Sequence, residues 1–293
     1  GNSMFDIKVI RNDPELFDAS LKKRGETPSS EEILKIDRER RKLIEELEKI
    51  KAERNNSSNQ FGASKNKNTN VNLDELRQKI SFQKTKISEL EEKVRAVEHS
   101  LYSVLVNLPN VLNEEVPIGI DERGNKEVSK SGIIKEFDFQ PLEHFEVNAA
   151  KYGLNFKDAA TVSGSRFVFL SGAMALLHRA LTQFMLNTHI NDNCLEEYWS
   201  PILVKESSMI GTGQLPKFEQ DSYKTSEGLW LIPTAEVPLT NIGRNKIYDV
   251  SELPKRMVSA TQCFRSEAGS AGKDTTGMIR QHQFEKVEMV TYC

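Results

Sequence analysis

The sequence is poor in cysteine and contains no long apolar run. Among its 293 residues are three cysteines, Cys194, Cys263 and Cys293, and they form no CxxC pair. This usage favours a reducing compartment and excludes a disulfide framework or a cysteine-based zinc site. Because it has neither a run of about 18 apolar residues nor a signal-peptide pattern, we expect no membrane-spanning helix. We therefore predict a cytoplasmic protein without a membrane partner.

A strong excess of one charge is also lacking. The 40 Lys and Arg residues and the 43 Asp and Glu residues give a formal net charge of −3. Any binding of nucleic acid must therefore come from a local patch. Neither a P-loop nor a GxGxxG motif occurs. The length predicts a sizeable core and two domains. Residues 1–3 precede Met4 and resemble an expression scar, so they are set aside.

The first third of the sequence predicts two long helices. Apolar residues recur at steps of three and four through residues 31–54 and 73–108, with polar residues at Arg40 and Gln83. A sustained spacing of about 3.5 residues is typical of a coiled coil. Residues 55–72 are rich in Asn and Ser and contain no acidic residue. They predict a flexible tip where the chain reverses, so that the helices pair antiparallel.

The charges of this hairpin allow two interpretations. Basic and acidic residues are balanced over residues 31–54, which is typical of a solvated face carrying ion pairs. The tip differs, because Lys65 and Lys67 have no acidic neighbours. A phosphate backbone is one partner that such a tip could bind.

After Asn113 the 3.5-residue spacing ends, and the pattern predicts a mixed body of helices and strands. Short apolar runs at 166–170, 199–204 and 228–233 predict strands. Residues 172–190 predict a helix that is apolar over most of its circumference. Such a helix is buried on several sides, either in a deep core or in a subunit interface.

Residues 261–293 predict two antiparallel strands joined by a long loop. Arg265 and Glu267 would share a face of the first strand, and Arg280, Phe284 and Glu288 a face of the second. Guanidinium groups suit phosphates, an aromatic ring suits a base, and a carboxylate suits an ammonium. The set fits a nucleotide joined to an amino acid. The alternative is an outer sheet face of cross-strand ion pairs.

Residues 264–289, FRSEAGSAGKDTTGMIRQHQFEKVEM, closely resemble motif 2 of the seryl-tRNA synthetases, a class II aminoacyl-tRNA synthetase family. Residues 211–218 and 231–241 are similar to other signature stretches of that family, and residues 172–190, followed by Pro201, resemble motif 1. The hairpin resembles the family's tRNA-binding arm. The resemblance implies an α+β fold, with an antiparallel coiled-coil arm over residues 4–112 and a class II antiparallel-sheet catalytic domain over residues 113–293.

The resemblance also implies an activity. The family activates L-serine with ATP to seryl-adenylate and transfers the seryl group to tRNA(Ser). The implied catalytic residues are Arg265 and Arg280. ATP would be bound by Arg265, Ser266, Glu267, Arg280, Gln281, His282, Gln283 and Phe284. Serine would be bound by Thr234, Ala235, Glu236, Arg265 and Glu288. The tRNA would contact the arm, with Lys65 and Lys67 at its tip.

Two departures from the family pattern qualify this expectation. Thr276 stands where many members have a basic residue, and motif 3 is absent. We therefore expect a truncated chain, inactive alone, with a homodimer formed through motif 1 in the parent protein. No metal ligand is assigned, because those for Mg²⁺ are expected mostly in motif 3. The alternative is a non-catalytic tRNA-binding or dimerisation fragment. A third possibility is a synthetase-like enzyme that loads an amino acid onto a carrier protein. It is disfavoured because such enzymes lack the arm.

Overall fold

The computed structural model describes residues 6–66, 72–270, 272 and 274–293. It divides into two compact units, Gly1–Gly132 and Ile133–Cys293, and each unit has hydrophobic clusters of its own.

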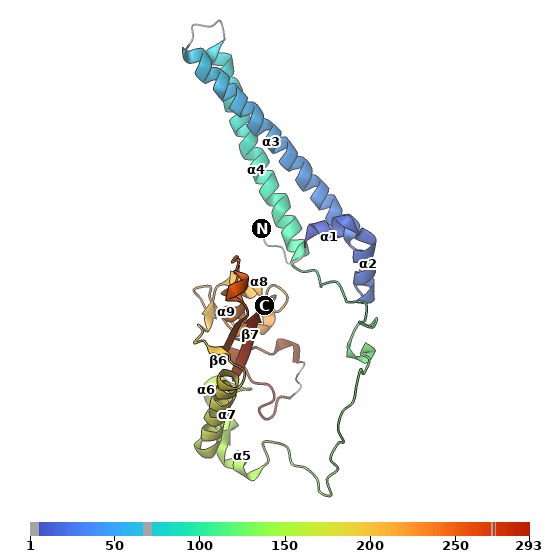
Figure 1. Cartoon of the computed structure of the whole chain (residues 1–293), viewed down its shortest axis with the longest axis vertical. Helices are drawn as coiled ribbons and strands as arrows, with labels where there is room; N and C mark the ends of the chain where they lie inside the picture. The colour runs from blue at the N-terminus through green and yellow to red at the C-terminus, as the bar shows by residue number, and fades with distance from the viewer. Residues whose placement is uncertain (1–5, 67–71, 271, 273) are drawn as a thin grey trace. The chain divides into compact units, whose positions relative to one another are not determined.

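The N-terminal unit is a helical hairpin with two short helices at its base (Figure 1). Asp13 accepts a hydrogen bond from the backbone N–H of Leu16, and Asn72 caps the second long helix in the same way. These side chains satisfy backbone donors that a helix start leaves unpaired. The helices are α1 (Ile7–Asn12), α2 (Pro14–Lys23), α3 (Ser30–Asn66) and α4 (Leu73–Leu105), followed by the 3₁₀ turn η1 (Glu122–Gly124).

The seam between α3 and α4 confirms the predicted hairpin. One cluster of buried residues lies at its base: Ile10, Phe17, Leu21, Ile33, Leu101 and Leu105. A second lies further along the hairpin: Leu47, Ile87 and Leu90, packed with Leu43, Ile50 and Val94. The apolar positions therefore face one another across two helices, and burial of these side chains stabilises the pairing.

The two polar positions of the seam are accommodated differently. Arg40 lies between carboxylates, 3.7 Å from Asp37 and 3.2 Å from Glu98, so its charge is paired. Gln83 is buried, and Ser57 of α3 is buried as well. The hairpin thus buries two polar side chains, and a buried polar residue can fix the register of a coiled coil.

The predicted tip is too long. Helix α3 continues to Asn66 instead of ending near residue 54. Packing explains the extension, because Ser57 is buried and the Arg77 guanidinium lies 5.6 Å from the Phe61 ring. Such contacts outweigh the weak helix propensity of Asn, Ser and Gly. Lys67 lies outside the described residues, and only the backbone of Lys65 is described, in the last turn of α3.

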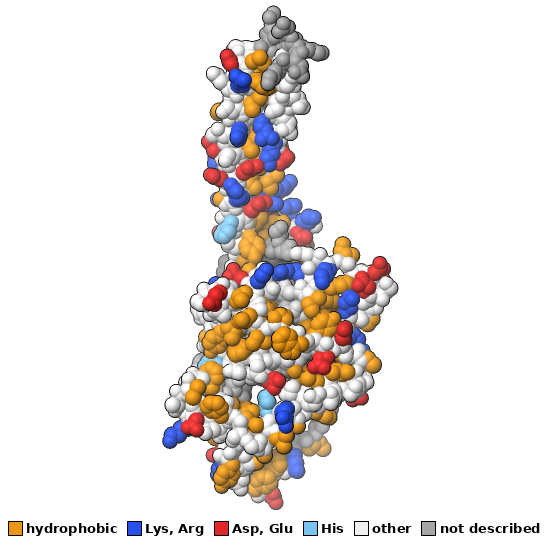
Figure 2. Space-filling model, turned by 90° about the vertical axis from the view of Figure 1, so that its left-hand side faces the viewer, with side chains coloured by type: hydrophobic (Ala, Val, Ile, Leu, Met, Phe, Trp, Pro, Cys, Tyr) orange, Lys and Arg blue, Asp and Glu red, His pale blue; other side chains and the backbone are white. Residues whose placement is uncertain are grey.

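Ion pairs cover the outer surface of the hairpin, as one of the two interpretations predicts. Lys51 lies 3.1 Å from Glu91, and Lys86 lies 4.0 Å from Glu46, so these pairs join α3 to α4. Figure 2 shows acidic and basic side chains interspersed along the arm. Exposed pairs of this kind contribute little stability each.

Leu90→Ala is expected to destabilise the N-terminal unit by about 2–5 kcal/mol, because Leu90 is 1% exposed and its loss leaves a cavity in the seam. Phe82→Ala is the matched control, since Phe82 on the same helix is 71% exposed. Chemical unfolding followed by the helical circular-dichroism signal measures both. Equal losses in the two variants would contradict the burial of this seam.

The C-terminal unit is built around a three-stranded sheet of order β3-β6-β7. Strand β6 (Lys255–Phe264) pairs antiparallel with β7 (Gln283–Tyr292) and parallel with β3 (Glu196–Glu197). Two small sheets pair β1 (Leu154–Asn155) with β2 (Phe169–Leu170), and β4 (Leu203–Val204) with β5 (Trp230–Leu231). The helices are α5 (Asn148–Gly153), α6 (Phe156–Ser163), α7 (Gly172–Asn191), α8 (Glu206–Gly211) and α9 (Glu236–Asn241). The 3₁₀ turns are η2 (Glu219–Asp221), η3 (Val250–Glu252) and η4 (Ala268–Ser270).

The three short predicted strands exist only in part. The runs at 166–170, 199–204 and 228–233 shrink to the two-residue strands β2, β4 and β5. Arg166 has a φ of 61°, in the left-handed region, so the extended segment begins only after it. Apolar composition predicted extended backbone at these places but not how few residues find a pairing partner.

Helix α7 matches the predicted helix at 172–190, and one side of it packs on the sheet. Leu186 lies in a cluster with Leu195 and Val258. Several apolar side chains of α7 are exposed, with Phe184 at 67%: Leu176, Leu177, Leu181, Phe184 and Met185. The deep-core interpretation of this helix is therefore wrong for the chain by itself. The interpretation as a subunit interface stays a prediction.

Candidate active site

The ribbon of β6 and β7 has the predicted antiparallel pairing. Cys263 lies opposite Phe284, and Ser259 lies opposite Glu288. Because side chains alternate along a strand, Phe284, Lys286 and Glu288 share one face, with neighbours about 6–7 Å apart. That face carries a ring, an ammonium and a carboxylate in a row.

The two arginines and Glu267 do not lie on the strands, contrary to the prediction. Strand β6 ends at Phe264, before Arg265, and β7 begins at Gln283, after Arg280. Glu267 has a φ of 53°, which no strand residue adopts. Arg265 and Glu267 therefore share no strand face, and of the second set only Phe284 and Glu288 lie on β7. The loop between the strands brings these side chains to the site instead.

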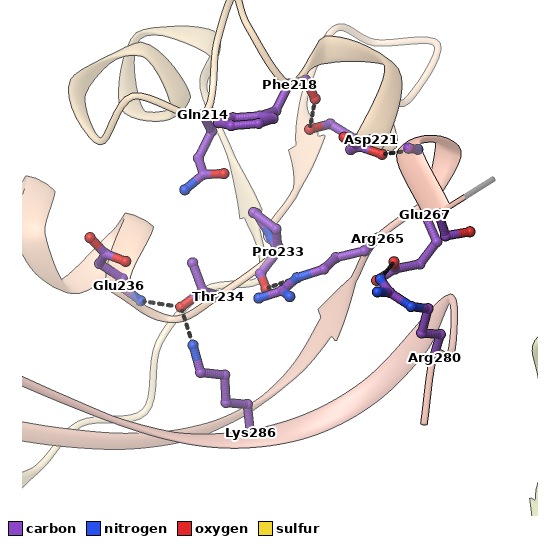
Figure 3. A pocket seen from close by; sticks show the side chains of 13 residues that line it. Gln214, Phe218, Asp221, Pro233, Thr234, Glu236, Arg265, Glu267, Arg280 and Lys286 are labelled. Atoms are coloured by element: carbon purple, nitrogen blue, oxygen red, sulfur yellow. Dashed lines mark hydrogen bonds and ion pairs between the residues drawn. The ribbon is translucent and has the colours of Figure 1, made fainter. Parts of the chain in front are cut away.

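A cavity of about 390 Å³ lies in front of this ribbon. Figure 3 shows side chains from the 233–236 segment, from the loop after β6 and from β7 pointing into it. Five of the predicted site residues line it: Thr234, Glu236, Arg265, Glu267 and Arg280. The others are Gln214, Phe218, Asp221, Ser222, Pro233, Gly269, Ser270 and Lys286.

One end of the cavity is formed by an ion-paired arginine. Arg280 lies 2.9 Å from Glu267 and 3.2 Å from Asp274. The hydrogen bonds that Arg280 donates to Glu267 and then to Asp274 raise the pKa of its guanidinium. The group is therefore a permanent cation that a phosphate can share with these carboxylates.

Arg265 and Phe284 form the middle of the site. The guanidinium carbon of Arg265 lies 5.1 Å from the centre of the Phe284 ring, a cation–π contact. The Arg265 Nε also donates a hydrogen bond of 3.3 Å to the Pro233 carbonyl. The arginine is thus held between the ring and the 233–236 segment, where its remaining N–H groups can bind an anion.

The other end of the cavity is a network of acceptors around Thr234. Thr234 is 4% exposed, and its hydroxyl donates a hydrogen bond of 2.9 Å to Glu288 Oε2. The same hydroxyl oxygen accepts from the backbone N–H of Glu236 at 3.2 Å and from Lys286 Nζ at 3.1 Å. Lys286 also forms an ion pair with Glu288. In the structure this end holds the ammonium of the chain's own Lys286, and the binding of a serine ammonium here stays a prediction.

Seven of the residues predicted to bind ATP or serine are not among those that line this cavity: Ala235, Ser266, Gln281, His282, Gln283, Phe284 and Glu288. His282 Nδ1 lies 3.0 Å from the Arg265 carbonyl oxygen, and the Ser266 hydroxyl donates to the Gln220 carbonyl. Ala235 is fully buried. Gln281 and Gln283 line a second cavity of about 460 Å³, which Phe284 also borders. Of the eight predicted ATP contacts, Arg265, Glu267 and Arg280 line the first cavity, whereas Gln281, Gln283 and Phe284 line the second.

Sequence reasoning missed Lys286, Gln214, Phe218 and Asp221 as part of the lining. The period of two along β7 would have found Lys286, because it lies between Phe284 and Glu288 on their face. Gln214 and Phe218 lie in the 211–218 stretch that the family resemblance marks. Asp221 has no comparable signal in the sequence.

Cys263 is expected to react with thiol reagents far more slowly than the exposed Cys194 and Cys293. Burial raises the pKa of the Cys263 thiol, so less of the reactive thiolate is present at pH 8. Mass spectrometry after timed iodoacetamide treatment measures each site. We expect at least ~10-fold slower alkylation at Cys263, and denaturant should abolish the difference. Equal native rates would contradict the pairing of this strand.

No described helix is long and apolar enough to cross a membrane. Within the same residues, no group of three or more His, Cys, Asp or Glu side chains is arranged to hold a metal ion.

Known families match both units. Residues 4–112 match the Seryl-tRNA synthetase N-terminal domain, and residues 217–293 match the tRNA synthetase class II core domain (G, H, P, S and T). The second match identifies the ribbon and its cavity as part of a class II synthetase core.

Individual relatives identify the family within the class II synthetases. The serine–tRNA ligase of Paracoccus denitrificans is 48% identical over 288 residues, covering 98% of this chain and 67% of its own length. That of Zymomonas mobilis is 46% identical over 287 residues, with the same coverages. The crystal structure of seryl-tRNA synthetase from Pyrococcus horikoshii complexed with ATP has a TM-score of 0.84 at 34% identity, covering 99% of this chain and 69% of that one. The chain belongs to the serine–tRNA ligase family.

Proposed function

We propose that the cavity in front of the β6–β7 ribbon binds ATP and L-serine, as part of the site at which a serine–tRNA ligase forms seryl-adenylate and charges tRNA(Ser). The observation that carries this is the order of groups along the cavity and along β7, whose Phe284 and Glu288 contact Arg265 and Thr234 of the cavity lining. A phosphate-binding arginine, an arginine on an aromatic ring and an ammonium site follow one another, as the parts of an aminoacyl-adenylate do. The ATP named for the Pyrococcus horikoshii structure supports the nucleotide.

In the first step, a carboxylate oxygen of serine attacks the α-phosphorus of ATP in line. A new oxygen–phosphorus bond forms while the bond to pyrophosphate breaks. Arg265 would hold the serine carboxylate and the α-phosphate together, and Arg280 would hold the outer phosphates. Negative charge develops on phosphate oxygens, so positioning and fixed cations supply the catalysis.

Phe284 and the Thr234 network would fix the two ends of the intermediate. The Phe284 ring offers a stacking surface for adenine. Glu288, beside Thr234 and Glu236, would bind the serine ammonium. In the second step, a terminal ribose hydroxyl of the tRNA attacks the seryl carbonyl carbon, and AMP leaves. Mg²⁺, for which ligands are expected mostly in motif 3, would offset negative charge on the phosphates.

The remaining parts of the chain would serve the tRNA and the dimer. We assign residues 4–112 to a tRNA-binding arm and residues 113–293 to the catalytic domain. The exposed apolar side chains of α7 fit a homodimer interface of the motif 1 type, since such a patch requires a partner.

Calorimetric titration with a seryl-sulfamoyl-adenosine analogue tests this function. The analogue keeps the ammonium, hydroxyl and base of seryl-adenylate and is not hydrolysed. The alanyl counterpart, which lacks only the hydroxyl, is the matched control. We expect the seryl compound to bind at least ~10-fold more tightly, because the polar site leaves a buried partner unpaired with alanine. Equal binding of both compounds, or no binding of either, would refute the proposal.

A further inference from the structure

Lys286 places an ammonium group where the proposed function requires the ammonium of the substrate. Its Nζ donates a hydrogen bond of 3.1 Å to the Thr234 hydroxyl and forms an ion pair with Glu288 (Figure 3). Thr234 and Glu288 are themselves joined at 2.9 Å. The two groups assigned to the amino acid's ammonium are therefore already bound to an ammonium of the chain.

This arrangement has an electrostatic reason. The Glu288 side chain is only 18% exposed, and a mostly buried carboxylate without a counter-charge is strongly disfavoured. Lys286 supplies that counter-charge before the amino acid enters. A second ammonium on the same acceptors would then bring two like charges into contact. The amino acid can bind well only if Lys286 withdraws.

The strand gives Lys286 an alternative partner within reach. It lies between Phe284 and Glu288 on one face of β7, and it lines the same cavity as Arg265. In the proposed intermediate, the base belongs at Phe284 and the ammonium at Glu288. The phosphate that joins them must lie between these ends, beside Lys286. A lysine carries its charge on a flexible four-carbon stem and can turn from one anion to the other.

We propose that Lys286 is a positioning residue that the substrate displaces. It neutralises Glu288 first, and it shifts its charge to the phosphate of seryl-adenylate when the serine ammonium takes its place. This inference rests on the proposed function. Free serine must displace Lys286 and offers it no phosphate, so the site disfavours free serine. A ligand that carries both an ammonium and a phosphate is favoured, because its phosphate binds the displaced Lys286.

Calorimetry on Lys286→Met separates this role from a purely structural one. We expect free serine to bind about 5-fold more tightly to the variant, since nothing has to be displaced, and the sulfamoyl analogue to bind at least ~10-fold more weakly, since its anion loses a partner. Lys255→Met is the matched control, because Lys255 also forms an ion pair in this sheet, 3.5 Å from Glu252, and faces a different cavity. Affinities that fall equally for both ligands, or that do not change, would overturn the inference.

Acetylation footprinting of the unsubstituted chain gives the same answer without a variant. Mass spectrometry reports how much of Lys286 acetic anhydride modifies. Serine should raise this fraction several-fold by releasing the ammonium, and the analogue should lower it. If the chain binds the seryl analogue more tightly than the alanyl one but the acetylated fraction of Lys286 does not change, only this inference fails. If the chain binds neither ligand, the proposed function fails.

Discussion

Glu288→Gln is expected to weaken binding of the seryl-sulfamoyl-adenosine analogue by roughly 100-fold. The substitution keeps the shape of the side chain and removes the charge that the substrate ammonium requires. Loss of one partner of a desolvated charge pair costs about 2–5 kcal/mol, which corresponds to factors of ~30 to ~5000. The hydrogen bond from Thr234 at 2.9 Å can persist to the amide oxygen, so the loss reports charge rather than collapse of the network.

Two controls accompany this variant. Glu285→Gln changes a carboxylate on the opposite face of β7. That carboxylate does not belong to the ammonium site and lies 2.6 Å from His178. Its effect on the analogue should stay within about 3-fold. A des-amino analogue, which lacks the ammonium, should not lose affinity for the Glu288 variant relative to the unsubstituted chain. If the variant loses affinity for both compounds alike, Glu288 does not act on the ammonium.

Removal of the distal half of the arm is expected to lower tRNA(Ser) affinity by ~100-fold or more at moderate salt, because contacts to phosphates dominate such binding. A variant in which a short Gly-Ser turn replaces residues 48–91 keeps the basal cluster of Ile33, Leu101 and Leu105. It also keeps the pairing of Arg40 with Glu98. A titration of labelled tRNA at two salt concentrations measures the change.

The same variant tests whether tRNA binding and analogue binding belong to different units of the chain. Analogue binding should be unchanged in the shortened variant, because that cavity belongs to the other unit. The salt dependence of the residual tRNA binding should also fall. A salt-sensitive tRNA complex of unaltered affinity would contradict the assignment of the arm.

The hairpin could be predicted because its signal is periodic and repeated. The steps of three and four that include Leu47 and Leu90 place these residues in the seam without knowledge of the rest of the chain. The end of α3 could not be predicted, because Asn, Ser and Gly are poor helix formers and only contacts such as Arg77 with Phe61 hold that segment helical.

The placement of the candidate site residues could be predicted only in part. The residue types at Arg265, Phe284 and Glu288 indicate a nucleotide joined to an amino acid, and β7 does place Phe284 and Glu288 on one face. Strand periodicity misplaced Arg265, Glu267 and Arg280, because it cannot detect where a strand gives way to a loop. The left-handed backbone at Glu267 depends on contacts from distant segments, such as the hydrogen bond from the Ser266 N–H to the Asp221 carbonyl at 2.9 Å.

A crystal structure of the chain with the seryl-sulfamoyl-adenosine analogue tests the central claim most directly. We predict that the ammonium of the ligand lies between Glu288 and Thr234, its sulfamate beside Arg265, and its adenine on the Phe284 ring. A ligand bound in another cavity, or one whose ammonium points away from Glu288, would contradict the account.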